Sequence, residues 1–296
     1  MKMLEIIKNS ELILNPDKSI YHLHLRPENI APTIILVGDP DRVDKVSRYF
    51  DSIDFKQHKR EFKTHTGYLS NKRITVISTG IGSDNIDIVL NELDALVNID
   101  FENRKTKPVL TSLNIIRIGT SGTIQKNIPI DSFLLSNKGL DLSGMLNNYN
   151  TEEIRNRKLE KLFCKHTNWS SEKAHPILVD SCKKLYKQLH SESIYSGITA
   201  TFNGFYAPQG RTLRLNPKDE NLIAKIEKIR LNKFKVTNFE METSAIFGLS
   251  KLLGHKSSSI NAILANRING NFSKSPEKTI DKLIQYCLNK LIDKKK

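Results

Sequence analysis

The chain has 296 residues, with 46 lysines and arginines against 32 aspartates and glutamates, and a formal net charge of +14. Its length suffices for one large α/β domain or two small ones, and an apolar share of 38% excludes an intrinsically disordered chain. The lysines are scattered, without an aromatic stripe among them, which argues against nucleic-acid binding and favours a basic surface that attracts small anions.

The three cysteines, Cys164, Cys182 and Cys287, lie far apart and have neither metal-binding nor redox spacing. Charged residues interrupt the first ten positions, so they lack the core of a signal peptide, and no apolar run approaches membrane-spanning length. We therefore expect a cytoplasmic protein with no membrane partner and no nucleic-acid partner.

Residues 1–32 have an irregular pattern that ends in two proline-containing pairs, which predicts an N-terminal arm rather than a core element. We expect residues 33–296 to form one domain. Residues 21–25 alternate, so His22 and His24 would share one face of a short extended piece. Two such histidines could ligate a metal, but the sequence nearby offers no third ligand at a metal-binding spacing. We therefore expect no metal here, and we expect the two histidines to be ordinary surface residues or to contact a partner.

The apolar run 33–37 predicts a strand that is followed at once by Gly38. Pro40 and the aspartates beside it predict a helix start, and the helical spacing continues to Phe50. A strand that leads through a glycine into a helix start presents free amides at the positive end of the helix dipole. Arg42 adds a full charge there, so the segment predicts an anion site, unless Arg42 only forms a surface salt bridge.

Residues 53–79 predict three strands with a turn at 71–72. Arg60 lies among them, and it is either a second anion contact or a part of the basic surface. Gly80 and Gly82 then lead into a helix that runs to Val97. Two glycines after a strand indicate a close approach of the backbone, but the pair is too short for a dinucleotide fingerprint.

After a polar loop over 98–112, residues 115–118 predict a buried strand that ends in a turn at 119–122. Ligands in α/β proteins bind at the carboxyl ends of strands. Arg117, Thr120 and Ser121 supply a guanidinium and two hydroxyls beside bare glycine backbone, which are the components of an oxyanion cradle. The alternative is a strand end with an outward-facing arginine.

The rest of the chain alternates between strand and helix patterns. We expect strands over 132–135, 194–201, 235–237 and 260–264, and helices over 151–165, through 245–252 and from about Pro276 onward. Such alternation predicts an α/β fold, a three-layer α/β/α single domain with a central mixed, mostly parallel sheet.

Two polar motifs follow predicted strands in this second half. In the loop 203–211, Phe205 offers an apolar wall, Gln209 can donate and accept, and Arg211 can stabilise charge on a carbonyl oxygen, which suits a planar polar ring. The alternative is a surface loop with a packed phenylalanine. In Glu240-Met241-Glu242, paired carboxylates could do acid or base work, bind a metal or hold a diol, or simply favour the dipole of the following helix.

These motifs occur in order between His22 and Arg267, and together they resemble the nucleoside phosphorylase family, most closely its uridine phosphorylase branch. The resemblance implies three groups of site residues: for phosphate Gly38, Arg42, Arg60, Arg117 and Thr120; for ribose His22, Met241 and Glu242; and for the base Ser121, Gly122, Phe205, Gln209 and Arg211. Of these, it implies that Arg211, Gln209 and Glu242 take part in catalysis.

The resemblance also implies an assembly, because the residues matching His22 and Arg60 reach the site of the neighbouring subunit. The expected protein is a homodimer with shared active sites, or a hexamer.

The activity that the resemblance implies is the reversible phosphorolysis of uridine to uracil and ribose 1-phosphate. Inorganic phosphate is the co-substrate, and no metal or organic cofactor is expected. The pair Asn266-Arg267 stands where bacterial purine phosphorylases carry Ser-Asp, which favours the pyrimidine branch. The alternatives are a purine nucleoside phosphorylase or nucleosidase of the same fold, or a non-catalytic nucleoside-binding protein.

Overall fold

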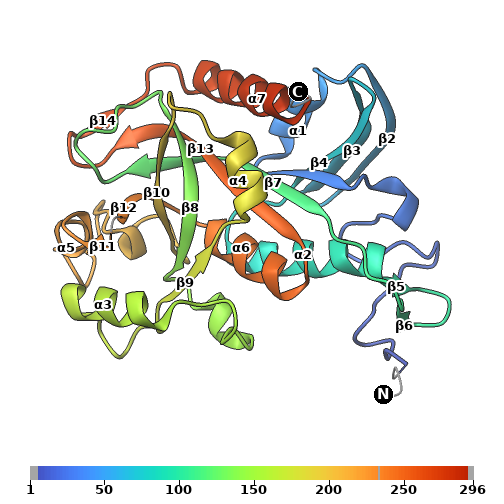
Figure 1. Ribbon diagram of the computed structural model, residues 1–296, viewed down its shortest axis with the longest axis horizontal. Helices are drawn as coiled ribbons and strands as arrows, with labels where there is room; N and C mark the ends of the chain where they lie inside the picture. Colours follow the sequence, from blue (N-terminus) through green and yellow to red (C-terminus); the bar gives the residue numbers. More distant parts are fainter. Residues whose placement is uncertain (1–5, 233, 293–296) are drawn as a thin grey trace.

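The computed structural model describes residues 6–232 and 234–292, and within them short apolar runs form a 12-stranded mixed sheet (Figure 1). Its strands are β1 (Thr33–Val37), β2 (Ser52–Lys59), β3 (Phe62–Leu69), β4 (Lys72–Ser78), β7 (Asn114–Thr123), β8 (Phe133–Asp141), β9 (Ile177–Asp180), β10 (Tyr195–Thr201), β11 (Arg230–Leu231), β12 (Phe234–Glu240), β13 (Lys256–Asn266) and β14 (Asn271–Phe272). Two short strands, β5 (Ile99–Asp100) and β6 (Lys105–Thr106), pair only with each other.

Helices connect these strands. They are α1 (Pro40–Ser47), α2 (Ser83–Asn98), α3 (Arg157–Thr167), α4 (Lys183–Leu189), α5 (Leu222–Glu227), α6 (Thr243–Leu252) and α7 (Pro276–Ile292), with 3-10 turns η1 (Pro27–Asn29), η2 (Met145–Asn148) and η3 (Ala207–Gln209). Among the described residues, none of these helices is long and apolar enough to cross a membrane.

The main sheet has the order β11-β12-β10-β8-β13-β7-β1-β4-β3-β2. Strands β4, β1, β7 and β13 run parallel to one another, as do β8, β10 and β12. The two parallel blocks meet antiparallel where β13 pairs with β8, and the edge strands β2 and β3 are also antiparallel. The expected mixed sheet is confirmed, with its parallel pairs confined to these two blocks.

One further pairing sets the position of the site. The end of β7 pairs antiparallel with β12, so that Gly122 lies opposite Phe239. Strands β7, β13, β8, β10 and β12 are thereby joined in a closed ring of pairings. The carboxyl ends of β7 and β12, which are far apart in the sequence, are held next to each other as a result.

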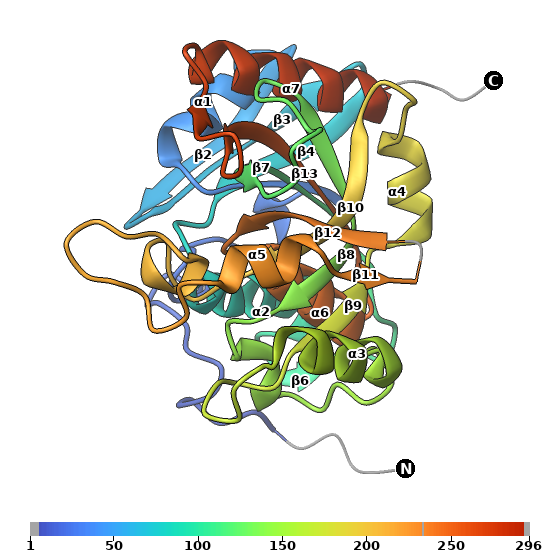
Figure 2. The ribbon, with the colours of Figure 1, turned by 90° about the vertical axis from the view of Figure 1, so that its left-hand side faces the viewer.

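Two helical layers cover the sheet, and β1 shows why. Its side chains alternate: Ile34 and Leu36 pack with α2 and α6 in one core, whereas Ile35 and Val37 pack with α1, α4 and α7 in another. Figure 1 shows α1 and α7 on one side of the sheet and α2 and α6 on the other. Helices α3 and α5 cover the ring strands in a third cluster and face the viewer in Figure 2. The expected three-layer α/β/α architecture is confirmed.

Several predicted boundaries were wrong where long-range pairing extends a strand. The expected turn at 119–122 is instead the continuation of β7, because Gly122 and Thr123 pair with both β12 and β13. The strand expected over 132–135 continues to Asp141, because β10 and β9 pair along it. Gly139, which interrupts its apolar pattern, allows α6 to pack closely, since a Cβ there would lie 2.8 Å from the Ser244 Cα atom.

The charged helix expected over 151–165 begins later, at Arg157. Asn156 caps it by accepting a hydrogen bond from the Leu159 backbone amide at 3.1 Å. The predicted loop 98–112 contains the small β5–β6 hairpin, and β9, α4, α5, β11 and β14 were not predicted.

The N-terminal arm contributes more to the fold than its irregular pattern indicates. Within its described part, Leu12, Leu23 and Leu25 are buried in the core that also contains α2, so the expectation of an arm outside the core was wrong. The expected extended piece over 21–25 was also wrong, because His24 has a φ of 53° and residues 21–23 form a turn. Residues 1–5 of the predicted arm, and the lysines at 294–296, lie outside the described residues.

Candidate active site

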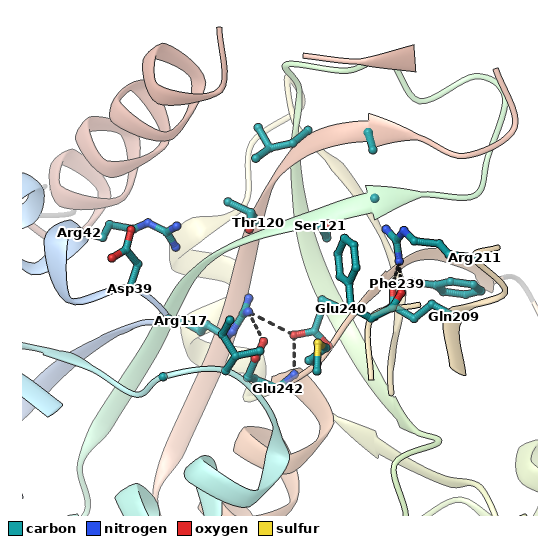
Figure 3. A pocket seen from close by; sticks show the side chains of 18 of the residues that line it. Asp39, Arg42, Arg117, Thr120, Ser121, Gln209, Arg211, Phe239, Glu240 and Glu242 are labelled. Atoms are coloured by element: carbon teal, nitrogen blue, oxygen red, sulfur yellow. Dashed lines mark hydrogen bonds and ion pairs between the residues drawn. The ribbon is translucent and has the colours of Figure 1, made fainter. Parts of the chain in front are cut away.

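A cavity of about 680 Å³ opens where β1, β7 and β12 reach their carboxyl ends (Figure 3). It brings together every predicted site residue except His22 and Arg60, and those lining it are Gly38, Arg42, Arg117, Thr120, Ser121, Gly122, Phe205, Gln209, Arg211, Met241 and Glu242. The size of the cavity is in the range of small-molecule sites.

Arg42 reaches this cavity from the first turn of α1. Asp39 caps the helix by accepting the Asp41 backbone amide at 2.9 Å, and Pro40 occupies the first helical position. The guanidinium donates to the Ile118 carbonyl at 3.4 Å, and no ion pair of Arg42 occurs within residues 6–232 and 234–292. Burial, together with the positive charge of Arg117, lowers the pKa of Arg42. A charged guanidinium in this position favours an anionic ligand.

Arg117 is buried on β7 and fixed at both ends of its guanidinium. Nη1 donates to the Asn261 side chain at 2.7 Å, and Nη2 forms an ion pair with Glu242 and lies 3.5 Å from Glu240. Burial acts to lower the pKa of Arg117, but the two carboxylates outweigh it and raise the pKa. The sequence predicted that this guanidinium belongs to an oxyanion cradle, with an outward-facing arginine as the alternative. The structure shows a buried side chain that is paired with carboxylates of its own chain.

Gly119 makes this arrangement of Arg117 possible. Two residues further along β7, it lies on the same face of the strand, and a Cβ added to it would stand 1.6 Å from Arg117 Nη1. The arginine side chain therefore lies over the bare backbone of Gly119 and reaches Asn261.

Glu240 and Glu242 lie where β12 passes into α6. Glu242 accepts the Gly82 amide at 2.7 Å, from the start of α2, and pairs with Arg117. Glu240 accepts the Glu242 and Thr243 amides at 2.9 and 2.8 Å, so Glu240 satisfies the first donors of α6. Burial raises the pKa of Glu240, and Arg117 opposes that shift.

The loop 203–211 forms the far wall of the cavity. The Arg211 guanidinium lies 3.7 Å from the centre of the Phe205 ring and donates to Gln209 Oε1 at 2.7 Å. Arg267 contacts this loop by donating to the Gln209 and Gly210 carbonyls, both at 3.2 Å. Burial, followed by the charge of Arg267, lowers the pKa of Arg211 to about 10.

The end of β7 supplies hydroxyl groups between these two walls. Thr120 and Ser121 both line the cavity, and Asn238 of the neighbouring β12 donates to the Ser121 hydroxyl at 3.0 Å. That contact depends on the pairing of β7 with β12.

His22 and Arg60 lie outside the cavity of their own chain, and both lie beside Tyr21. The His22 ring contacts the Tyr21 ring edge-on at 4.8 Å, and the Arg60 guanidinium lies 5.9 Å from the centre of the same ring. His22 Nδ1 is 2.6 Å from Glu92 Oε1. Their predicted role in the site of a neighbouring subunit stays a prediction.

Sequence reasoning missed several residues that line the cavity. Glu240 was seen only as one of two carboxylates, and Arg267 only as a marker of the pyrimidine branch. Others carried no chemical signal because they contribute apolar surface: Ile81, Phe239, Leu264, Ala265 and Phe272.

A family model described as the phosphorylase superfamily matches residues 32–289. The uridine phosphorylase of Thermococcus kodakarensis is 29% identical over 277 residues, which are 93% of this chain and 88% of that protein. The uridine phosphorylase of Haemophilus influenzae is 26% identical over 250 residues, which are 84% of this chain and 86% of that protein. A crystal structure of a Trypanosoma brucei nucleoside phosphorylase that shows uridine phosphorylase activity superposes with a TM-score of 0.86 at 27% identity, covering 95% of this chain and 99% of the other. The match over residues 32–289 spans most of the chain, which therefore belongs to the phosphorylase superfamily.

Proposed function

We propose that this protein is a uridine phosphorylase, which uses inorganic phosphate to cleave uridine reversibly into uracil and ribose 1-phosphate. The uridine phosphorylases among its relatives and the geometry of the cavity both support this activity.

The observation that carries the proposal is the order of charges along the cavity. In Figure 3, Arg42 and Arg117 lie at one side, Glu240 and Glu242 in the middle, and Arg211 with Gln209 at the other side. Phosphorolysis of a nucleoside needs a negative nucleophile, a sugar that becomes positive, and a base that leaves with negative charge. The cavity therefore complements the transition state in each of its three parts.

The first part is a phosphate subsite at Gly38, Arg42, Arg117 and Thr120. The side chain of Arg42 carries a positive charge that no carboxylate of the described residues neutralises by direct contact, and α1 and Gly38 offer backbone at the end of β1. Guanidinium groups bind phosphate oxygens in a fixed fork, so the anion would be held in one orientation.

The middle part would hold the ribose, with Glu242 accepting its hydroxyls and Met241 packing beside it. A phosphate oxygen attacks C1′ as the bond between C1′ and the base nitrogen breaks, and the electron pair of that bond passes to the base. Holding both reactants in one pocket supplies the alignment that this displacement needs. We propose that phosphate is the only co-substrate and that no metal or organic cofactor takes part.

The third part would receive the uracil between Phe205, Gln209 and Arg211, with Ser121 and Gly122 beside it. Arg211 would stabilise the negative charge that the departing ring gains, and the amide of Gln209 can both donate and accept. Arg267 would keep this loop in place by its contacts with the Gln209 and Gly210 carbonyls.

We further propose a cytoplasmic homodimer in which His22 and Arg60 complete the cavity of the neighbouring subunit. Both residues lie at the protein surface around Tyr21 and outside their own cavity, which is the placement that a shared site requires.

An absorbance assay with uridine or inosine, each with and without inorganic phosphate, tests the function directly. The expected result is conversion of uridine that occurs only when phosphate is present. Conversion without phosphate would identify a nucleosidase, preference for inosine a purine phosphorylase, and binding without conversion a nucleoside-binding protein; each would overturn the proposal.

A further inference from the structure

We propose that Glu240 is a positioning residue of this site: it holds the backbone at Glu242 and Thr243 so that Glu242 faces the sugar, and it does so without binding a ligand itself. The inference rests on the proposed function, because the sugar is the ligand that Glu242 would bind.

The hydrogen bonds of Glu240 carry the inference. Its Oε2 atom accepts the amides of Glu242 and Thr243 at 2.9 and 2.8 Å and the Thr243 hydroxyl at 2.9 Å. Its Oε1 atom accepts the Thr201 hydroxyl at 2.6 Å. With 4% of its surface exposed, Glu240 is already surrounded by donors of its own chain.

These contacts join three elements at the point where the site is built. Thr201 ends β10, Glu240 ends β12, and Thr243 begins α6. Thr201 in turn accepts the Ser244 amide at 2.9 Å, so the first turn of α6 is anchored both directly and through a hydroxyl. Glu242 is the residue immediately before this turn, and its direction depends on how the turn is fixed.

Glu242 has a different environment, which separates the two carboxylates by role. One of its oxygens accepts the Gly82 amide, and the other faces Arg117. Its contacts come from across the cavity rather than from its own helix, and α6 receives no side-chain cap from it. Glu240, at the end of β12, thus fixes the backbone, and Glu242, just before α6, would bind the ligand.

Arg117 does not depend on Glu240 to the same degree. Its Nη2 atom is 3.5 Å from Glu240, but the guanidinium is bonded more closely to Asn261 and Glu242. Loss of Glu240 would leave the bond from Arg117 to Asn261 in place and would remove one negative charge from beside the phosphate subsite. Phosphate affinity is therefore not expected to fall.

Two substitutions separate positioning from general stability. Glu240→Leu fills the space but accepts no hydrogen bond. Glu240→Gln keeps one oxygen that can accept both helix amides, and its amide NH2 group can donate to Thr201. The matched control is Glu160→Leu. Glu160 is fully buried in α3, pairs with Arg155 at 2.7 Å and accepts the Leu178 amide at 2.9 Å, and it lies away from the cavity.

The experiment measures uridine KM and kcat by absorbance, inorganic phosphate affinity by calorimetry, and thermal stability for each variant. For Glu240→Leu we expect at least a tenfold rise in uridine KM with no loss of phosphate affinity, and for Glu240→Gln recovery to within about threefold of the wild type. Glu160→Leu is expected to lower the thermal stability while uridine KM stays within twofold.

Three results would overturn the inference. They are an unchanged uridine KM in Glu240→Leu, a loss of phosphate affinity in Glu240→Leu without a rise in uridine KM, and a Glu240→Gln variant as impaired as Glu240→Leu. A wild-type protein that fails to convert uridine would overturn the proposed function instead, so the two failures are distinguishable.

Discussion

Gly119→Ala tests whether the direction of Arg117 creates the phosphate subsite. The added Cβ would stand 1.6 Å from Arg117 Nη1 and 2.6 Å from Asn261 Oδ1. Both distances are too short for a non-bonded contact, so the two side chains would have to move. Gly119 does not have a positive φ, so the substitution acts through this clash and not through backbone strain. The guanidinium must leave its place over the strand and give up its bonds to Asn261 and Glu242.

The size of the effect follows from the bonds that Arg117 would lose. A hydrogen bond to a charged group contributes about 2 kcal/mol, so the loss of one such bond to bound phosphate raises phosphate KM about 30-fold. Breaking the buried pair with Glu242 leaves a carboxylate unpaired, which costs about 3 kcal/mol of folding free energy. We therefore expect a variant that folds with reduced stability and has a selectively raised phosphate KM.

The assay is the initial rate of uridine cleavage at saturating uridine and varied phosphate, alongside thermal unfolding. Gly67→Ala is the control, because its Cβ would meet the Ser52 carbonyl at 2.1 Å between β2 and β3, away from the cavity. That variant is expected to lose stability while its phosphate KM stays within twofold. An unchanged phosphate KM in Gly119→Ala, or an equal rise in both variants, would refute the reasoning.

Three further predictions concern other parts of the molecule. Arg42→Ala should raise phosphate KM at least tenfold and leave uridine KM within threefold, whereas Arg211→Ala should raise uridine KM and spare phosphate KM. Steady-state rates at varied phosphate and uridine check this. Equal losses of both affinities in either variant would contradict the division of the cavity into a phosphate part and a base part. Hydrogen bonds from Ser19 hold the pKa of Asp17 at about 2, below the ordinary 3.8, so this carboxylate stabilises the fold above about pH 4 and loses that effect as the pH falls through 2. The difference in melting temperature between wild type and Asp17→Asn should therefore shrink toward pH 2. A difference that stays constant with pH would contradict a stabilising role of the ionised Asp17 carboxylate. Burial raises the pKa of the Cys287 thiol, so alkylation followed by mass mapping should modify Cys287 only after unfolding, and modification in the native protein would show the thiol to be accessible.

The parts of the fold that could be predicted from the sequence are those with local signals. Residues 34–37 are all apolar because β1 is buried on both faces there. Pro40 after Asp39 is a local signal for the start of α1. The resemblance to the nucleoside phosphorylase family implied that Arg42 and Arg117 share one phosphate site. The structure shows β1, which precedes Arg42, and β7, which carries Arg117, to be parallel neighbours.

The parts that could not be predicted depend on contacts across the sequence. Nothing near Arg117 indicates that its partner is Glu242, 125 residues away, or that Asn261 holds its other nitrogen. The end of β7 could not be predicted either, because its glycines and hydroxyl residues are typical of a turn and only the pairing with β12 and β13 makes it a strand. Short elements such as α5 (Leu222–Glu227) bury only a few residues and leave too little periodicity to recognise.

The pairing of β7 with β12 explains why one stretch serves both fold and site. It places Ser121 beside Asn238 and brings the strand that carries Arg117 next to the strand that ends in Glu240. A glutamate is rarely buried unless donors surround it, and here the start of α6 provides them. The groups that would bind phosphate and sugar are therefore fixed by the same bonds that close the ring of strands. Substitutions at these positions should alter stability and affinity together, which is why matched controls elsewhere in the fold are needed to separate the two effects.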